Sequence, residues 1–168
     1  AYYIVSINNV FEDGDFYHGT LSTDGYQGYV PKSGLVPSMA VSTYRGPTFR
    51  VPTHRVIVPR SLVTRTVDIK SGTQFGLSLG AQVTVRDSDK SSDVHNVQIQ
   101  TPHGVGYMPR RHLVPCDHKV TDWVAIAESL LGTPYSWGGR DSRGLDCSAL
   151  IQLALQTAGI ASPRDSGP

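Results

Sequence analysis

The chain has 168 residues, enough for one large domain or two to three small ones, and its 39% hydrophobic content is ordinary for a globular protein. A net charge near +1, with no basic stretch interleaved with aromatic residues, excludes a nucleic-acid partner. No run approaches the roughly eighteen apolar residues of a membrane span, and the first residues do not form a signal peptide.

An internal repeat organises the first two thirds of the chain. The residues 28–37 (GYVPKSGLVP) return as residues 106–115 (GYMPRRHLVP), with six identical positions. Alternating and β-branched sequence precedes the second copy, as in 81–86 (AQVTVR) and 96–101 (NVQIQT), and predicts short antiparallel strands. The repeat therefore indicates two small β modules.

Each Gly-Tyr-x-Pro segment, followed by Leu-Val-Pro, resembles the final strand and single helical turn of bacterial SH3-like barrels, a family of cell-wall-associated modules. The resemblance implies the C-terminal part of a first module in 1–37, a linker in 38–54 and a second module in 55–115. The first copy is preceded by too few residues for a whole small barrel. We therefore expect the first module to be incomplete at its N-terminus.

The chain has only two cysteines, Cys116 and Cys147, which excludes a disulfide-built fold. They also form no metal-type Cys-x-x-Cys pair. They could pair with each other, but we expect Cys147 to stay a free thiol. Cys116 also lies near His112 and His118, where three ligands at this spacing match no common zinc pattern. We expect no metal and no cofactor.

The chain next enters an α-rich segment, residues 116–168. Thr121 or Asp122 caps a predicted helix that Gly132 ends, with Pro134 just beyond. The apolar residues of this helix fall on one stripe, namely Trp123, Ile126, Ala127, Leu130 and Leu131. The change from strands to helices predicts an α+β protein.

A glycine-rich run then ends on an Asp-Cys-Ser triplet that opens a second helix, which Gly159 ends. A cysteine in the first helical turn lies near the positive end of the helix dipole and unpaired N–H groups, and both favour thiolate over thiol. We expect the buried face of this helix to begin at Cys147 and to continue through Leu150, Ile151, Ala154, Leu155 and Ala158.

Cys147 is therefore the candidate nucleophile, with Asp146 and Ser148 as polar neighbours and Tyr135 and Trp137 as aromatic walls. Acyl transfer by a thiolate needs a base, usually histidine, and oxyanion donors, of which the Cys147 backbone N–H can be one. Three alternatives stay open. In the first, Cys147 is a small buried hydrophobe and not a nucleophile. In the second, Asp146 is only a helix cap, and in the third, Ser148 is solvated or bonds the backbone.

The segment 131–152 resembles the nucleophile region of NlpC-type cysteine peptidases of the bacterial cell wall. It carries in order the Gly-x-Pro-Tyr-x-Trp-Gly-Gly element, the Asp-Cys-Ser triplet and a helix with Gln152. The resemblance covers about 123–168 and implies the helical N-terminal part of a papain-like peptidase domain in 116–168. It also implies hydrolysis of murein peptides, typically between γ-D-glutamate and a diamino acid.

By the same resemblance, Cys147 attacks the carbonyl, Asp146 and Ser148 help hold the free amino terminus of an L-alanyl peptide, and Tyr135 lines the site near the cysteine. Ala149 stands where the family usually has glycine. All six histidines precede Cys147, whereas the family's base follows the cysteine on a downstream strand. His112 or His118 as a substitute base stays open, because triads are set by geometry and not by chain order.

Without that base we expect the chain to be a fragment, inactive alone and completed by a missing C-terminal segment or a second chain, or else an inactive relic. The leading hypothesis is a murein-peptide cysteine endopeptidase. The competing ones are a non-catalytic cell-wall binding protein, and an amidase or acyltransferase on the same scaffold. The substrate favours the cell envelope or peptide recycling, and the absence of a visible signal segment favours the cytoplasm.

Overall fold

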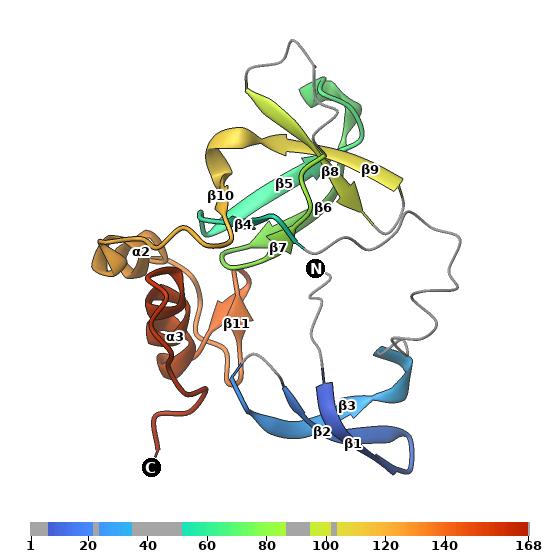
Figure 1. The fold of residues 1–168 in the computed structure, drawn as a ribbon, viewed down its shortest axis with the longest axis vertical. Helices are drawn as coiled ribbons and strands as arrows, with labels where there is room; N and C mark the ends of the chain where they lie inside the picture. The colour runs from blue at the N-terminus through green and yellow to red at the C-terminus, as the bar shows by residue number, and fades with distance from the viewer. Residues whose placement is uncertain (1–6, 22–23, 35–51, 87–94, 102–103, 168) are drawn as a thin grey trace.

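The computed structural model describes residues 7–21, 24–34, 52–86, 95–101 and 104–167. Three parts are visible in Figure 1: a small N-terminal sheet, a larger β unit, and two helices that lie beside the β unit. Within the described ranges, no helix is long and apolar enough to cross a membrane.

The N-terminal sheet is an antiparallel meander in the order β1-β2-β3. Its strands are β1 (Ile7–Asp13), β2 (Phe16–Leu21) and β3 (Gln27–Pro31). The 3₁₀ turn η1 (Lys32–Gly34) follows β3, because a proline at the strand end has no N–H to continue the ladder.

The larger β unit, residues 52–86, 95–101 and 104–115, consists of two antiparallel sheets in the orders β6-β5-β9-β8 and β10-β4-β7. The first contains β5 (Arg60–Thr64), β6 (Thr73–Ser78), β8 (Asn96–Thr101) and β9 (Gly104–Pro109). The second contains β4 (His54–Val56), β7 (Gln82–Val83) and β10 (Leu113–Pro115). Two 3₁₀ turns complete the unit, η2 (Ile69–Ser71) and η3 (Arg110–His112).

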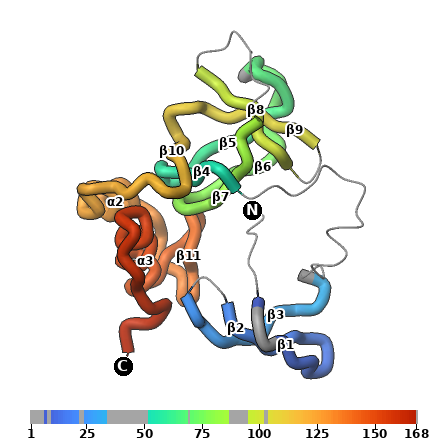
Figure 2. Tube along the Cα trace, in the orientation of Figure 1, coloured from blue at the N-terminus to red at the C-terminus, as the bar shows by residue number. Residues whose placement is uncertain are grey.

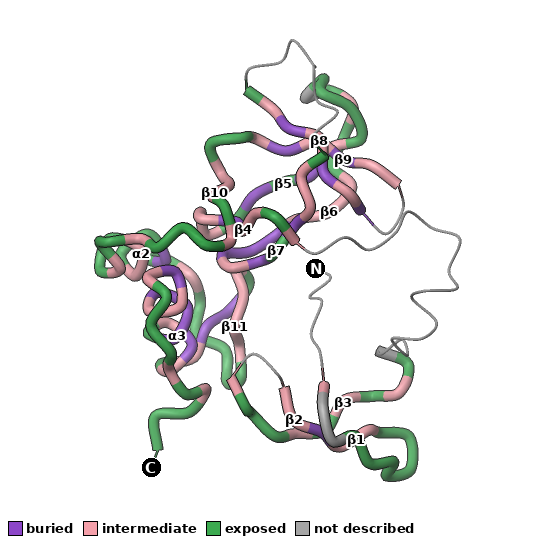
Figure 3. The backbone as a smooth tube through the Cα atoms, in the orientation of Figure 1, coloured by how far each residue is buried: buried purple, intermediate pink, exposed green. Residues whose placement is uncertain are grey.

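A single apolar cluster lies between these two sheets, and Figure 3 shows buried positions alternating along their strands. In β8, every second residue is buried, as the period of a strand requires. The buried members of the cluster are Val56, Val63, Leu77, Ala81, Val83, Val97, Ile99 and Met108.

A closed SH3-like barrel, expected for 55–115, is absent from the described residues. Strand β5 pairs with β9 only at Thr64 and Tyr107, and the two sheets are joined only by an isolated bridge between Val85 and Ile99. A barrel needs an uninterrupted ladder with a fixed stagger around its circumference, which these contacts do not provide. The described structure is thus a mixture of sheets and helices, and the SH3-like assignment stays a prediction.

The repeat does produce the same local structure twice. In the first copy β3 runs into η1, and in the second copy β9 runs into η3, so the predicted strand and helical turn are confirmed. In the second copy β9 is not the final strand, because β10 follows η3. Residues 35–37 of the first copy lie outside the described residues. Strand β4 begins at His54, the last residue of the predicted linker, and the division of the chain into domains stays a prediction.

Both predicted helices are present. Helix α2 (Trp123–Ser129) begins after Asp122, whose carboxylate accepts the Ala125 N–H at 2.9 Å. Helix α3 (Cys147–Thr157) begins after Asp146 and is followed by Gly159, which has a φ of 74°. A short hairpin of β11 (Arg140–Asp141) and β12 (Gly144–Leu145) leads into α3.

The predicted buried face of α3 is wrong in part: Ala154 is buried as predicted and Leu150 packs against a buried cluster, but two predicted members are exposed. Cys147 and Ile151 are exposed, and the buried residues are Ala149, Gln152, Leu153, Ala154 and Thr157. Hydrophobic periodicity missed this face because it contains Gln152, which is fully buried with its amide hydrogen-bonded on both sides. Leu153 packs beside Leu79 and Leu145 in a second apolar cluster.

The β unit holds the C-terminal end of α3 through Arg55 of β4. The guanidinium donates to the carbonyls of Gln156 (3.1 Å) and Thr157 (2.6 Å), and to the carbonyl of His118. A cation at the carbonyl groups of the last helical turn complements the negative end of the helix dipole. Ser78 of β6 also forms hydrogen bonds with Ser142 in the hairpin that leads into α3. The β unit therefore contacts the chain just before α3 as well as the C-terminal end of the helix.

Arg55→Gln should therefore lower the free energy of unfolding by about 1.5–3 kcal/mol, since it removes charged hydrogen bonds to three carbonyls. Urea denaturation of the two proteins measures this difference. Arg60→Gln, at an exposed position of β5, is the control and should change stability by less than about 0.5 kcal/mol. Equal effects of the two substitutions would contradict the role of Arg55.

Candidate active site at the start of helix α3

The glycine-rich hairpin places the first residue of α3. The Asp146 N–H donates to the Gly139 carbonyl at 3.1 Å, and the Leu145 N–H donates to the Pro134 carbonyl at 3.0 Å. A Cβ on Gly139 would lie 2.6 Å from the Gly144 carbonyl oxygen, and one on Gly144 would lie 2.5 Å from Ser136 Cβ. Only glycine allows these two backbone segments to approach so closely.

Asp146 is the N-cap of α3. Its extended backbone (φ −96°, ψ 176°) precedes the helix, and its Oδ1 accepts the Ala149 N–H at 2.8 Å and the Ser148 hydroxyl at 3.2 Å. The helix-cap interpretation of Asp146 is thus confirmed as geometry. Ser148 is not a backbone ligand, because its hydroxyl bonds side chains in this cluster.

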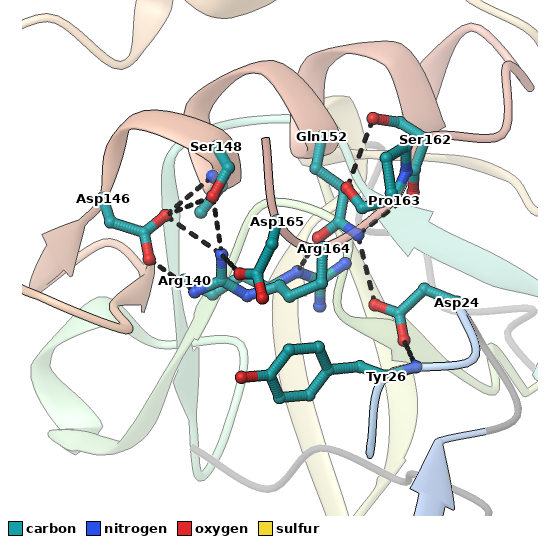
Figure 4. Close-up of polar contacts among 11 residues, drawn as sticks. Asp24, Tyr26, Arg140, Asp146, Ser148, Gln152, Ser162, Pro163, Arg164 and Asp165 are labelled. Carbon is teal, nitrogen blue, oxygen red and sulfur yellow. Dashed lines mark hydrogen bonds and ion pairs between the residues drawn. The ribbon is translucent and has the colours of Figure 1, made fainter. Parts of the chain in front are cut away.

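Arg164 completes the cluster, as Figure 4 shows. Its guanidinium donates to both carboxylate oxygens of Asp146, at 3.1 Å (Oδ1) and 2.6 Å (Oδ2), and to Ser148 Oγ at 2.9 Å. The side chains of Arg164 and Asp146 are only 10% and 11% exposed. This two-pronged, largely buried contact is the strong form of an ion pair.

The Arg164 hydrogen bond lowers the pKa of Asp146 to about 2, although burial opposes the shift. The Ala149 N–H, the charge of Arg164 and the Ser148 hydroxyl lower this pKa further. Asp146 is therefore ionised throughout the physiological pH range, and its charge is compensated by Arg164.

Cys147 is exposed and free, so the interpretation of a buried hydrophobe is wrong. Cys116 is also a free thiol, but it is partly buried. Burial raises the pKa of Cys116, and the neighbouring Asp117 adds to this effect while Arg55 opposes it. Of the two thiols, Cys147 is the more accessible to a substrate.

The two aromatic residues of the predicted site are strongly exposed. Tyr135 is 65% exposed and forms a parallel bridge with Leu145, immediately before the N-cap, while Trp137 is 90% exposed. Their contribution to folding is small, because exposed rings bury little apolar surface. Both rings are therefore available to a ligand near Cys147.

The histidines named as substitute bases have other contacts. The His112 ring nitrogen Nδ1 lies 2.9 Å from Ser61 Oγ in the β unit, and burial together with Arg111 lowers its pKa. Arg55 donates to the carbonyls of both His118 and Thr157, so the backbone of His118 lies at the C-terminal end of α3. That end is about 15 Å from Cys147 along the helix. These contacts do not bring either histidine to Cys147. The described residues contain no cluster of metal-ligating side chains.

Sequence reasoning missed a polar network around Gln152. Its Oε1 accepts from Arg140 Nε at 2.7 Å, and its Nε2 donates to Asp24 Oδ2 and the Ser162 carbonyl, each at 3.2 Å. In the sequence, Gln152 belongs to the helix of the NlpC-type segment, and nothing in its sequence distance from Asp24 indicates a contact between the two. A polar residue on an otherwise apolar helical face was the available signal.

Residues 132–168 match the model of the NlpC/P60 family. This family match includes the start of α3. Over 64 residues the chain is 42% identical to a protein of Mycobacterium tuberculosis named "Probable endopeptidase", which covers 36% of this chain and 17% of that protein. Over 47 residues it is 40% identical to a "Gamma-D-glutamyl-L-lysine dipeptidyl-peptidase" of Bacillus cereus, which covers 28% of this chain and 14% of that protein.

The fold is similar to the crystal structure of an NlpC/P60 family protein from Bacillus cereus. The TM-score is 0.70 at 20% identity, and the match covers 98% of this chain and 55% of that one. The chain thus spans about half of the solved relative and less than a fifth of the two curated relatives (17% and 14%). These findings define an NlpC/P60-type segment whose relatives are named as peptidases.

Gly139→Ala should destabilise the protein by about 2–4 kcal/mol, because the new Cβ would meet backbone atoms that cannot move aside without breaking the hairpin. Gly138→Ala is the control. Gly138 has a φ of 72° but open space around its Cα, so the substitution costs only about 1–2 kcal/mol of backbone strain. Denaturant unfolding distinguishes the two, and a larger cost at Gly138 would contradict this account.

The Asp146 carboxylate should also make stability depend on pH. Because folding lowers its pKa from 3.8 to about 2, its stabilisation is fully present above about pH 4 and is lost as pH falls toward 2. Asp146→Asn keeps a capping oxygen but removes the charge. At pH 6 the free energy of unfolding of the wild type should exceed that of this variant by on the order of 1–2 kcal/mol. The difference should shrink steadily between pH 4 and pH 2.5. Urea unfolding at each pH measures it, and a difference independent of pH would contradict the role of the charge.

Proposed function

We propose that the protein is a cysteine peptidase that hydrolyses murein peptides at γ-D-glutamyl-diamino acid bonds, in substrates with a free N-terminal L-Ala. One observation carries the proposal: an exposed thiol, Cys147, opens a capped helix within the segment that matches the NlpC/P60 family. The name of the Bacillus cereus relative supports the kind of bond.

In the proposed reaction, the Cys147 thiolate attacks the scissile carbonyl carbon and forms a tetrahedral intermediate. The Cys147 backbone N–H, unpaired at the start of α3, donates to the developing oxyanion. The C–N bond then breaks, the amine leaves with a proton from the general acid, and water hydrolyses the thioester to regenerate the thiol. The positive end of the helix dipole favours both the thiolate and the oxyanion.

The general base is assigned to a histidine outside these residues, in a continuation of the chain or in a second chain. All six histidines of the sequence precede Cys147, and the two nearest in sequence have the distant contacts described above. The base would accept the thiol proton and later donate it to the leaving amine.

Asp146 and Ser148 are proposed to contact the ammonium group of the substrate. Among the described residues, Asp146 Oδ2 accepts a hydrogen bond only from Arg164, and a carboxylate oxygen has room for a second donor. An ammonium can therefore share the carboxylate with Arg164. Tyr135 and Trp137, both exposed, are proposed to form the walls beside the peptide.

The full-length gene product should release L-Ala-γ-D-Glu from L-Ala-γ-D-Glu-diaminopimelate, as mass spectrometry can show. Cys147→Ala should abolish release, whereas the control Cys116→Ala should retain it, because Cys116 is partly buried and lies outside the cluster. N-acetylation of the substrate should lower kcat/KM by about 10²-fold, since it removes the charged contact with Asp146. Release by Cys147→Ala at the wild-type rate would exclude the mechanism.

Non-catalytic binding to murein is the second candidate, favoured by the two repeat-containing β units. Binding of murein fragments without any cleavage by the full-length protein would support it. Release of ammonia or transfer of the acyl group to an added amine would instead indicate an amidase or an acyltransferase on the same scaffold.

A further inference from the structure

The segment that follows α3 folds back along this helix, and Figure 2 shows it returning beside α3 toward the C-terminus. Ser162 contacts Gln152 in the middle of the helix, and two residues later Arg164 contacts Asp146 and Ser148 at its start. The returning segment therefore delivers an arginine to the helical turn that begins with Cys147.

The geometry of Arg164 is specific to a guanidinium. One nitrogen serves Asp146 Oδ1 and Ser148 Oγ, and the other serves Asp146 Oδ2. A planar fork can satisfy three acceptors in this arrangement, whereas a lysine ammonium is a single compact donor group. Because the side chain of Arg164 is only 10% exposed, water cannot readily take over its hydrogen bonds.

The pair also has an electrostatic consequence for the neighbouring cysteine. The Asp146 carboxylate is adjacent in sequence to Cys147, and an uncompensated negative charge there opposes formation of a thiolate. Arg164 compensates this charge, in the same helical turn that carries the positive end of the α3 dipole.

Other charged groups border the cluster. Asp165 lies 4.0 Å from Arg164 but is 68% exposed, so solvent screens it. Tyr26, from the N-terminal sheet, lies close enough to influence Arg164 (Figure 4). Arg140 is bound to Gln152 and to Gln156 Oε1 on α3, at 2.7 Å each. None of these groups forms a hydrogen bond with the Asp146 carboxylate among the described residues, so Arg164 is its principal counterion.

Gln152 connects this cluster to the N-terminal sheet. Its amide bonds Asp24, which lies between β2 and β3, and the Ser162 carbonyl in the returning segment. The same Asp24 carboxylate accepts the Tyr26 N–H at 3.1 Å through its other oxygen. The N-terminal sheet thus helps to fix the segment that carries Arg164.

We propose that Arg164 is the positioning residue of this site, which neutralises and orients Asp146 so that Cys147 can exist as a reactive thiolate. The inference deepens the proposed function, since it concerns the same nucleophile. Its test does not depend on that function, because alkylation of the thiol needs neither a substrate nor a general base.

The experiment measures the rate of iodoacetamide alkylation of Cys147 from pH 5 to pH 10 in the full-length protein carrying Cys116→Ala. Arg164→Gln should slow alkylation at pH 7 about tenfold and move the midpoint of the pH profile upward by about one unit. Arg164→Lys should fall between this variant and the parent. Arg143→Gln is the matched control, because it removes an exposed arginine that pairs with Asp141 on the preceding hairpin, and it should leave the profile unchanged.

The decisive variant combines Arg164→Gln with Asp146→Asn. It removes both charges, so the proposal expects alkylation at pH 7 to recover to within about threefold of the parent. An unchanged profile for folded Arg164→Gln, or a double variant as slow as the single one, would overturn the proposal. Circular dichroism and thermal unfolding report folding, and if Arg164→Gln does not fold, Arg164→Lys and the double variant make the same comparison. If alkylation follows these expectations while murein peptides stay intact, the positioning role stands and the peptidase assignment fails.

Discussion

The N-terminus of α3 depends on a carboxylate that is shared between a helix and an arginine. Asp146 caps the helix through the Ala149 N–H and binds Arg164 through both oxygens. A buried carboxylate without a partner would be costly, and a helix start without a cap would leave N–H groups unpaired. One side chain meets both requirements, and the accessible thiol of Cys147 lies directly beside it.

Helix α3 is therefore held at both ends by arginines, Arg55 from the distant β unit and Arg164 from the segment that follows the helix. Arg55 binds carbonyl groups at its C-terminal end, and Arg164 binds the cap at its N-terminal end. The helix also buries Leu153 against Leu79 of the β unit and Gln152 against a network that reaches Asp24. A nucleophile on such a helix has little freedom to move, which favours precise alignment with a substrate.

Much of the local structure could be predicted. The caps of both helices, the end of α3 and the strand and turn of each repeat copy follow from short-range chemistry, such as an aspartate before an apolar stripe. The exposure of Cys147 and the end of α2 at Ser129 were not predicted. The buried face of α3 could not be predicted from periodicity, because Gln152 lies on it. Its burial is favourable only with Arg140, Asp24 and the Ser162 carbonyl as partners. The barrel expected from the repeat likewise depends on long-range pairings that a short motif does not specify.

The sequence by itself determined which residues begin the two helices, where α3 ends, where the glycine-rich turn lies, and that an Asp-Cys-Ser triplet opens α3, because caps and tight turns depend on neighbours a few residues apart. Only the tertiary structure decided that Arg164 neutralises Asp146, that Arg55 holds the far end of α3, and that Asp24 reaches Gln152. These contacts join residues 18, about 100 and 128 positions apart. Their formation depends on how packed elements bring side chains together in space, which no local pattern encodes.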